Sequence, residues 1–383
     1  MESKDQSMRR QAAELERIYA YLKSKGYISR NLKAEDKQSY IQSNIQSNED
    51  WGDNIEYDKS DEAVHLRALI TQDTIIHNPV KLNNSTGCTY QIFLYCLNKV
   101  KKKIMSIPER PLFFEDSLSA KDPENIYRLH IRYALLMTLM RIKGSPTQGQ
   151  LSASFDISPP IVSSYLAFMR SILQDILPTA RKLFKKMHKD SSVVKKLIPD
   201  NKILIDGTVT PVQRLEDAQQ EVYSDKNKHG YNTLILANTD GMIIGASTPA
   251  EGSSHDMAVL DKFKPELDGL FNSLGKKAKN LQLYSDKGFI GIDKRFPNIS
   301  MKQSSKKPKS GPLIGKENSR NKKINRIRIG VEHTIERIKR FGVTTTPYDD
   351  TIEEFDVNMQ IVTGLVNLKL AHRHKKYQWL FDL

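Results

Sequence analysis

Apolar residues recur every three or four positions between Asn125 and Leu177, a spacing that predicts amphipathic helices. Leu151 and Phe155 lie one helical turn apart on a short apolar face. The run Asp156-Ile157-Ser158 interrupts the pattern, and Pro159-Pro160 opens a second helix. A short helix, a three-residue turn and a second helix have the spacing of a helix-turn-helix unit.

In such a unit the first turns of the second helix lie in the major groove of DNA. Here those turns would present Ser158, Ser163 and Ser164. An ordinary helical hairpin has the same pattern, so DNA binding and a purely structural role both stay open at this point.

After Asp200 the pattern changes to short β-type runs separated by turns. The predicted strands are Lys202–Ile205, Tyr231–Ala237, Met242–Ala246 and Leu281–Tyr284, with a hairpin turn at Asn238–Gly241. The predicted helices are His255–Phe263, Pro265–Leu274 and about Asn325–Phe341. This order predicts an α/β domain in which a mixed sheet carries helices on its faces.

We therefore expect four regions along the chain. They are an N-terminal region with helices and a polar connector and no assigned role (1–110), the helix-turn-helix region (111–180), a basic linker (181–200) and the α/β domain (201–375).

The 383 residues are 38% hydrophobic, and the longest apolar runs, such as Tyr133–Met140, are far shorter than the roughly 20 residues that cross a bilayer. The first residues have no apolar core of a secretory signal, and two cysteines cannot form a disulfide framework. We expect an intracellular protein without a membrane partner, in the cytoplasm or nucleoid of a prokaryote or the nucleus of a eukaryote.

The net charge of +14 favours a polyanionic partner, although it does not distinguish DNA from RNA or anionic lipid. Residues 302–340 contain 13 Lys and Arg but only 3 Asp and Glu. This stretch is either a surface for a nucleic-acid backbone or a solvated face. Its candidates for contacts to DNA are Lys306, Lys307, Arg328 and Lys339.

Two of the predicted strands lead into an aspartate. Asp206 directly follows Ile205, and Asp286 follows Tyr284 after one serine; a third acid, Glu332, lies on the predicted basic helix. A carboxylate at the carboxyl edge of a strand faces the crevice where open α/β sheets bind ligands. Aspartates at strand ends also serve as turn and cap residues, which is the structural alternative.

Carboxylate oxygens are the ligands that Mg²⁺ prefers, usually together with a substrate phosphate. Two such ions about 3.5–4 Å apart activate the attacking oxygen and stabilise the leaving oxygen of a phosphodiester. Three acids within a basic chain therefore favour metal-assisted chemistry on a nucleic acid.

Four segments in this order resemble the DDE transposases, specifically the Harbinger-like group and related insertion-sequence transposases. They are Ile205-Asp206-Gly207-Thr208, Gly252-Ser253-Ser254-His255-Asp256, Ser285-Asp286-Lys287-Gly288-Phe289-Ile290-Gly291, and Asn325-Arg326-Ile327-Arg328 leading to Val331-Glu332-His333. The resemblance extends over about residues 200–372, and the preceding helix-turn-helix looks like the one found before such nuclease domains.

The resemblance implies an RNase H-like domain in which Asp206, Asp286 and Glu332 bind two Mg²⁺ or Mn²⁺ ions. Relatives often carry an Arg four positions before the Glu and a basic residue seven after it, which Arg328 and Lys339 match. It further implies a transposase that binds terminal inverted repeats, hydrolyses phosphodiesters and transfers strands to target DNA, as a homodimer or higher oligomer.

This chain departs from the pattern at two positions, Asn325 and Phe289, where relatives often have tyrosine. His255 and Asp256 are accessory candidates, and Asp256 is an alternative second acid. We favour Asp286 because Asp256 opens a helix, where an aspartate caps free N–H groups. Glu336 is the rival third ligand. A transposase-derived DNA-binding protein and a nuclease without transposition remain alternative functions.

Overall fold

The computed structural model describes residues 71–106, 129, 131–213, 223–224, 228–305, 315–348 and 351–383. The chain divides into two compact units. Of the described residues, the helical unit takes those within 71–85, 97–139 and Pro146–Met169, and the α/β unit takes those within Thr86–Cys96, Met140–Ser145 and Arg170–Leu383. The predictions for residues 1–70, and for Lys306 and Lys307, lie outside the described residues.

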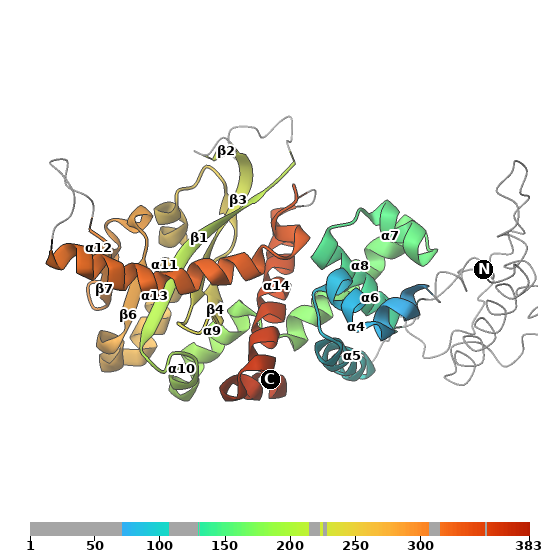
Figure 1. Ribbon diagram of the computed structural model, residues 1–383, viewed down its shortest axis with the longest axis horizontal. Coiled ribbons are helices and arrows are strands. Elements are labelled where there is room, and N and C mark those ends of the chain that lie inside the picture. Colours follow the sequence, from blue (N-terminus) through green and yellow to red (C-terminus); the bar gives the residue numbers. More distant parts are fainter. Residues whose placement is uncertain are drawn as a thin grey trace, which may run out of the picture. The chain divides into compact units, whose positions relative to one another are not determined.

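Among the described residues, five helices contribute to the helical unit (Figure 1). They are α4 (Pro79–Thr86), α5 (Tyr90–Met105), α6 (Ile131–Gly144), α7 (Gln148–Phe155) and α8 (Pro159–Ile176). Thr147 caps α7: its hydroxyl accepts a hydrogen bond from the Gln150 N–H, and the Gln150 side chain accepts one from the Thr147 N–H. The predicted helix, turn and second helix are confirmed, with Asp156 in the left-handed conformation that ends α7.

The α/β unit contains a mixed sheet with the strand order β2-β3-β1-β6-β7, and β4 and β5 also pair with β3. The strands are β1 (Lys202–Pro211), β2 (Tyr223–Ser224), β3 (Lys228–Ala237), β4 (Ile243–Ala246), β5 (Ala250–Glu251), β6 (Gln282–Ser285) and β7 (Ser300–Gln303). β1 is antiparallel to β3 and parallel to β6, and β6 is parallel to β7. The prediction of a mixed sheet with helices is confirmed.

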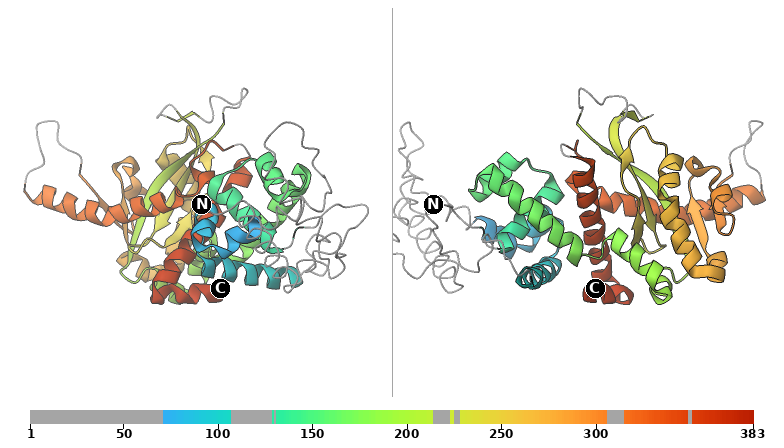
Figure 2. Two further views of the ribbon diagram at one scale, coloured as in Figure 1. Left: turned by 45° about the vertical axis from the view of Figure 1, so that its right-hand side comes forward. Right: turned by 180° about the vertical axis from the view of Figure 1, so that it is seen from behind.

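The two faces of the sheet are covered by different helices. α13 (Lys316–Ile338) crosses one face, as Figure 1 shows, and the reverse view in Figure 2 shows α11 (Asp256–Leu274) on the other. Ile203 and Ile205 of β1 join the hydrophobic core beneath α11, whereas Leu204 contacts α13. This alternation means that Asp206, two residues after Leu204, belongs to the α13 face.

The expected basic linker (181–200) instead forms two helices, α9 (Ala180–Lys189) and α10 (Ser191–Leu197). Leu183, Phe184 and Met187 of α9 are buried in the core, because they share one face of the helix. The lysines of this segment thus flank an apolar stripe that packs into the α/β unit.

Three elements are longer than the sequence pattern predicts. β1 continues through Asp206 to Pro211, α11 is one helix that includes Pro265, and α13 begins at Lys316 rather than near Asn325. The shorter elements are η1 (Gly275–Asn280), η2 (Lys287–Phe289), α12 (Ile292–Arg295), η3 (Gly342–Thr344) and η4 (Lys375–Asp382).

Helix α14 (Ile352–Arg373) was also not predicted, because its residues from Asn358 to Leu368 are all buried and leave no amphipathic period. Some of its buried polar residues bond to backbone groups of other segments. The Asn367 side chain accepts a hydrogen bond from the Ile243 N–H and donates to the carbonyls of Ile243 and Pro178.

None of the helices within the described residues is long and apolar enough to cross a bilayer. Cys88 and Cys96 are buried thiols without a disulfide, as expected.

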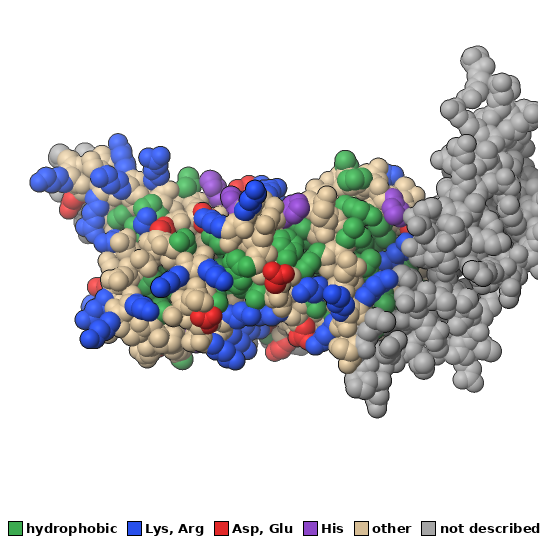
Figure 3. Space-filling view, turned by 90° about the horizontal axis from the view of Figure 1, so that it is seen from below, with side chains coloured by type: hydrophobic (Ala, Val, Ile, Leu, Met, Phe, Trp, Pro, Cys, Tyr) green, Lys and Arg blue, Asp and Glu red, His purple; other side chains and the backbone are tan. Residues whose placement is uncertain are grey.

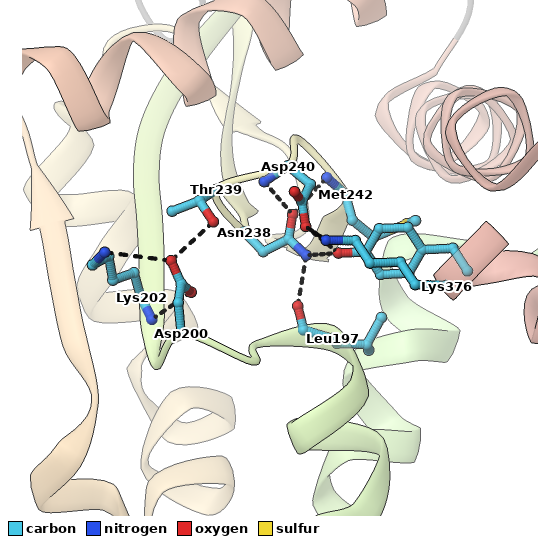
Figure 4. Close-up of polar contacts among 9 residues, drawn as sticks. Leu197, Asp200, Lys202, Asn238, Thr239, Asp240, Met242 and Lys376 are labelled. Atoms are coloured by element: carbon cyan, nitrogen blue, oxygen red, sulfur yellow. Dashed lines mark hydrogen bonds and ion pairs between the residues drawn. The ribbon is translucent and has the colours of Figure 1, made fainter. Parts of the chain in front are cut away.

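The turn between β3 and β4 is held by a polar network (Figure 4). The amide of Asn238 donates to the Leu197 carbonyl at 2.6 Å and to the Tyr377 hydroxyl at 2.8 Å. Tyr377 and Lys376 both donate to the Asp240 carboxylate. Burial would raise the pKa of Asp240, but these two hydrogen bonds, together with the charges of Lys376 and His374, outweigh it and lower the pKa. The network ties the C-terminal segment to the turn.

We predict that Tyr377→Phe lowers the free energy of unfolding by about 1–3 kcal/mol, because it removes a buried donor and acceptor at once. Lys376→Gln removes a half-exposed ammonium from the same carboxylate and should cost less than about 1 kcal/mol. Urea unfolding measures both values. An equal or larger loss for Lys376→Gln would contradict this reading of the network.

Candidate active site

The sheet register places the two aspartates side by side. Leu204 of β1 pairs with Tyr284 of β6, so Asp206 and Asp286, each two residues further on, are level and belong to the same face. β6 ends at Ser285, whereas β1 continues with Asp206 opposite Ile235 of β3. Asp206 is therefore within a strand, contrary to our expectation, yet it lies where the parallel pairing ends.

Arg328 of α13 brings the third acid to this pair. Its guanidinium lies 3.7 Å from the Asp206 carboxylate, 3.3 Å from that of Asp286 and 3.6 Å from that of Glu332. Glu332 is one helical turn beyond Arg328. Arg328 is 8% exposed, and its Nε has no hydrogen-bond partner. Acids from three separate segments thus converge on one buried cation.

Asp206 is the most buried of these acids, with 21% of its side chain exposed against 50% for Asp286 and 53% for Glu332. Burial raises the pKa of Asp206 to about 6. The Gly207 N–H, 2.9 Å from the carboxylate, and Arg328 act in the opposite direction, while Asp286 and Asp256 raise the pKa further. The Gly207 N–H and the Arg328 guanidinium thus only partly offset the cost of burying a charged Asp206 carboxylate.

A fourth carboxylate, that of Asp256, approaches from the α11 side of the sheet. A side chain at Gly207 would overlap it, and one at Gly288 would lie 3.5 Å from it. The amide of Asn232 on β3 donates to Asp256 at 2.9 Å. Asp256 does open α11, but its carboxylate is directed at the strands rather than used as a helix cap. The absence of side chains at the two glycines makes this approach sterically possible.

The remaining candidates from the sequence lie outside this cluster. His255 is exposed at the start of α11, and Lys339 is exposed at the end of α13. Glu336 is exposed and pairs with Arg340 at 3.7 Å. Arg328, which we expected to face DNA, is instead buried among the acids.

In the helical unit, Ser158, Ser163 and Ser164 are exposed at the start of α8.

Asn232 was missed by the sequence analysis. It lies in a predicted strand that is mostly apolar, and nothing in that pattern marks a polar residue that holds a distant carboxylate.

The chemistry of the donors fits a divalent metal ion. All four acids offer carboxylate oxygens, which hard cations prefer, and one guanidinium cannot neutralise them all. Among the described residues no three His, Cys, Asp or Glu side chains already form a metal-binding group. The cation between these acids is the guanidinium of Arg328.

We predict that Asp206→Asn stabilises the metal-free protein by about 1–2 kcal/mol at pH 7. Because the folded-state pKa lies above the usual 3.8, the folded protein binds more protons than the unfolded chain between about pH 4 and pH 6. Wild-type stability therefore falls as pH rises through this window, and the gain from Asn disappears near pH 4.

Urea unfolding across this pH range tests the prediction, with the exposed Asp293→Asn as the control for loss of a negative charge. A wild type and an Asp206→Asn variant of equal stability at every pH would show that Asp206 ionises without cost.

Two family models match the chain. The DDE superfamily endonuclease matches residues 205–367, and the helix-turn-helix of DDE superfamily endonuclease matches residues 127–179. The first match contains all four acids of the site, and the second contains α7 and α8.

Among curated proteins, the chain is similar to the "Probable transposase for insertion sequence element IS702" of Microchaete diplosiphon. The two are 24% identical over 295 residues, which cover 76% of this chain and 95% of the relative. No solved structure matches the chain. From the two models and this relative together, we conclude that the chain belongs to the DDE superfamily of transposases.

Proposed function

We propose that the protein is a DNA transposase that uses Mg²⁺ or Mn²⁺ to hydrolyse phosphodiesters and to transfer the freed strands to target DNA. The observation that carries the proposal is the convergence of Asp206, Asp286 and Glu332 on Arg328. Acids that a protein gathers despite their mutual repulsion need cations. A phosphodiester is also negatively charged, so divalent ions held by the carboxylates would attract the substrate as well.

The order and direction of the strands support an RNase H-like fold for the α/β unit. β1 lies between antiparallel β3 and parallel β6, and β7 extends the parallel part. This arrangement leaves the carboxyl end of β6 beside β1, where both aspartates lie.

In this proposal Asp206, Asp286 and Glu332 hold two divalent ions, which would polarise the attacking water or 3′-hydroxyl and neutralise charge on the reacting phosphate. Arg328 holds the three carboxylates together and keeps a positive charge at their centre. Asn232 orients Asp256, whose negative charge adds to that beside Asp206.

The helical unit would recognise the terminal inverted repeats through the start of α8. The relative's name refers to an insertion sequence, which supports a mobile element as the substrate. By analogy with proteins that bring two DNA ends together in one complex, we propose that the protein acts as a homodimer or a higher oligomer on DNA.

We predict that Asp206→Asn, Asp286→Asn and Glu332→Gln each reduce Mg²⁺-dependent nicking by more than about 100-fold, since even the neighbours of metal ligands contribute 10–100-fold. Binding to a duplex that carries the element's own end should stay nearly unchanged. Gel assays of nicked, joined and bound DNA measure all three quantities.

Glu336→Gln is the matched control, because Glu336 lies one turn further along the same helix and pairs with Arg340. Loss of nicking in Glu336→Gln with activity in Glu332→Gln would reassign the third ligand. Loss in Asp256→Asn with activity in Asp286→Asn would likewise reassign the second. Nicking without joined products favours a nuclease, and binding without nicking favours a transposase-derived DNA-binding protein.

A second prediction concerns the start of α8. Ser163→Gln should change the preferred base pair at one position of the repeat by about 1–3 kcal/mol and leave the salt dependence of binding unchanged, because glutamine reads a base edge and adds no charge. Selection from a randomised repeat measures the preference. Ser154→Gln, on the exposed surface of α7, is the control. An unchanged preference in Ser163→Gln would exclude Ser163 from base contacts.

A further inference from the structure

A basic groove lies at the β7 edge of the sheet, away from the four acids. It has a volume of about 680 Å³ and lies between β7 and the first turns of α13. Four of its lining residues are cations, namely Lys302, Lys316, Arg320 and Lys323; the others are Gly315, Ser319 and Ile324. None of the described residues that line it carries a carboxylate. The space-filling view of Figure 3 shows Lys and Arg side chains projecting from this end of the α/β unit.

The cations form one stripe because of their spacing. Lys316, Arg320 and Lys323 follow each other at steps of four and three residues, which places them on one face of α13. Lys302 on β7 faces them from the other side of the groove. Glu317 lies on the same helix but does not line the groove.

None of the four cations forms an ion pair with a residue that the structure describes. Other surface cations of this unit do have partners: Lys264 pairs with Asp268, and Arg295 pairs with Asp261. Unpaired like charges that face one concave surface repel one another, and an external anion relieves this repulsion.

Hydrogen bonds join α13 to Ser304 and Ser305, the two residues that follow β7. The side chain of Asn321, which is 7% exposed, accepts from the Ser305 N–H at 3.0 Å and donates to the Ser305 carbonyl at 3.2 Å. One turn further along, Asn325 accepts from the Ser304 hydroxyl at 2.7 Å. These contacts fix the distance between Lys302 and the cations of the helix.

The groove is also connected to the acids. Gln303, the neighbour of Lys302, donates to the backbone carbonyl of Asp286. α13 itself carries both the groove cations and Glu332. Because a helix rises 1.5 Å per residue, Lys323 and Lys316 precede Glu332 by about 14 Å and about 24 Å along the helix axis.

We propose that this groove binds the sugar–phosphate backbone of the DNA that is being cut, roughly four to seven nucleotides from the reacting phosphate. The spacing follows from the helix distances and the 3.4 Å rise per nucleotide of a strand. The groove would set the position of the cut by holding the backbone at a fixed distance from the acids. The inference rests on the proposed function, which places the reacting phosphate at those acids.

The test uses the full-length triple variant Lys316→Gln, Arg320→Gln, Lys323→Gln. Its control is Lys276→Gln, Lys277→Gln, Lys279→Gln, which removes the same charge from the exposed surface of η1. The slope of log affinity against log salt for duplex DNA should become shallower by roughly 2–3 in the groove variant, because each phosphate contact contributes about 0.9. It should stay unchanged in the control variant.

Phosphate ethylation interference then locates the contact, on a duplex with the element's own end and on target DNA. Wild type should show interfering phosphates roughly four to seven nucleotides from the cut, and the groove variant should lose them. Loss on the end duplex identifies element DNA, and loss on the target identifies target DNA. Circular dichroism verifies that the variants are folded.

An unchanged salt slope and an unchanged interference pattern in the groove variant would overturn the inference, whether or not the acids are catalytic. If the variants of the acids still nick DNA, the proposed function fails, and this result does not depend on the groove. The two failures are therefore distinguishable.

Discussion

The guanidinium of Arg328 is the interaction on which the site depends. Asp206, Asp286 and Glu332 come from β1, the end of β6 and α13, and without a cation between them their charges would repel one another. α13 crosses the sheet so that Arg328 reaches both aspartates, and Glu332 follows because it lies one turn away. The fold thus assembles the acids through one residue of one long helix.

The same helix joins two surfaces of opposite charge. Its C-terminal half contributes to a group of four acids that one arginine cannot neutralise, and its N-terminal turns line a groove without acids. A nuclease that acts on DNA needs both properties: cations that contact the DNA backbone, and acids that hold metal ions at the reacting phosphate. In our proposal the rigidity of α13 determines the distance between these two functions.

Much of the site could be predicted from the sequence, because local signals marked it. An apolar strand followed by an aspartate, twice, marked Asp206 and Asp286, and the helix-turn-helix was readable from its turn and from the prolines that open its second helix. The position of Asp256 was not readable, since it depends on Asn232 and Gly207, which approach it only in the folded sheet. The buried role of Arg328 was missed because it lies within a basic run that resembles a surface. α14 was missed because burial on all sides removes the helical period.

The most direct test of the account is to replace the metal ions with Fe²⁺ in the complex with DNA and to map where the resulting hydroxyl radicals cut the polypeptide. The account predicts cuts near Asp206, Asp286 and Glu332 together, suppressed by excess Mg²⁺ and lost in Asp206→Asn. Cuts confined to other segments, or cuts that Asp206→Asn leaves unchanged, would contradict a metal site formed by these three acids.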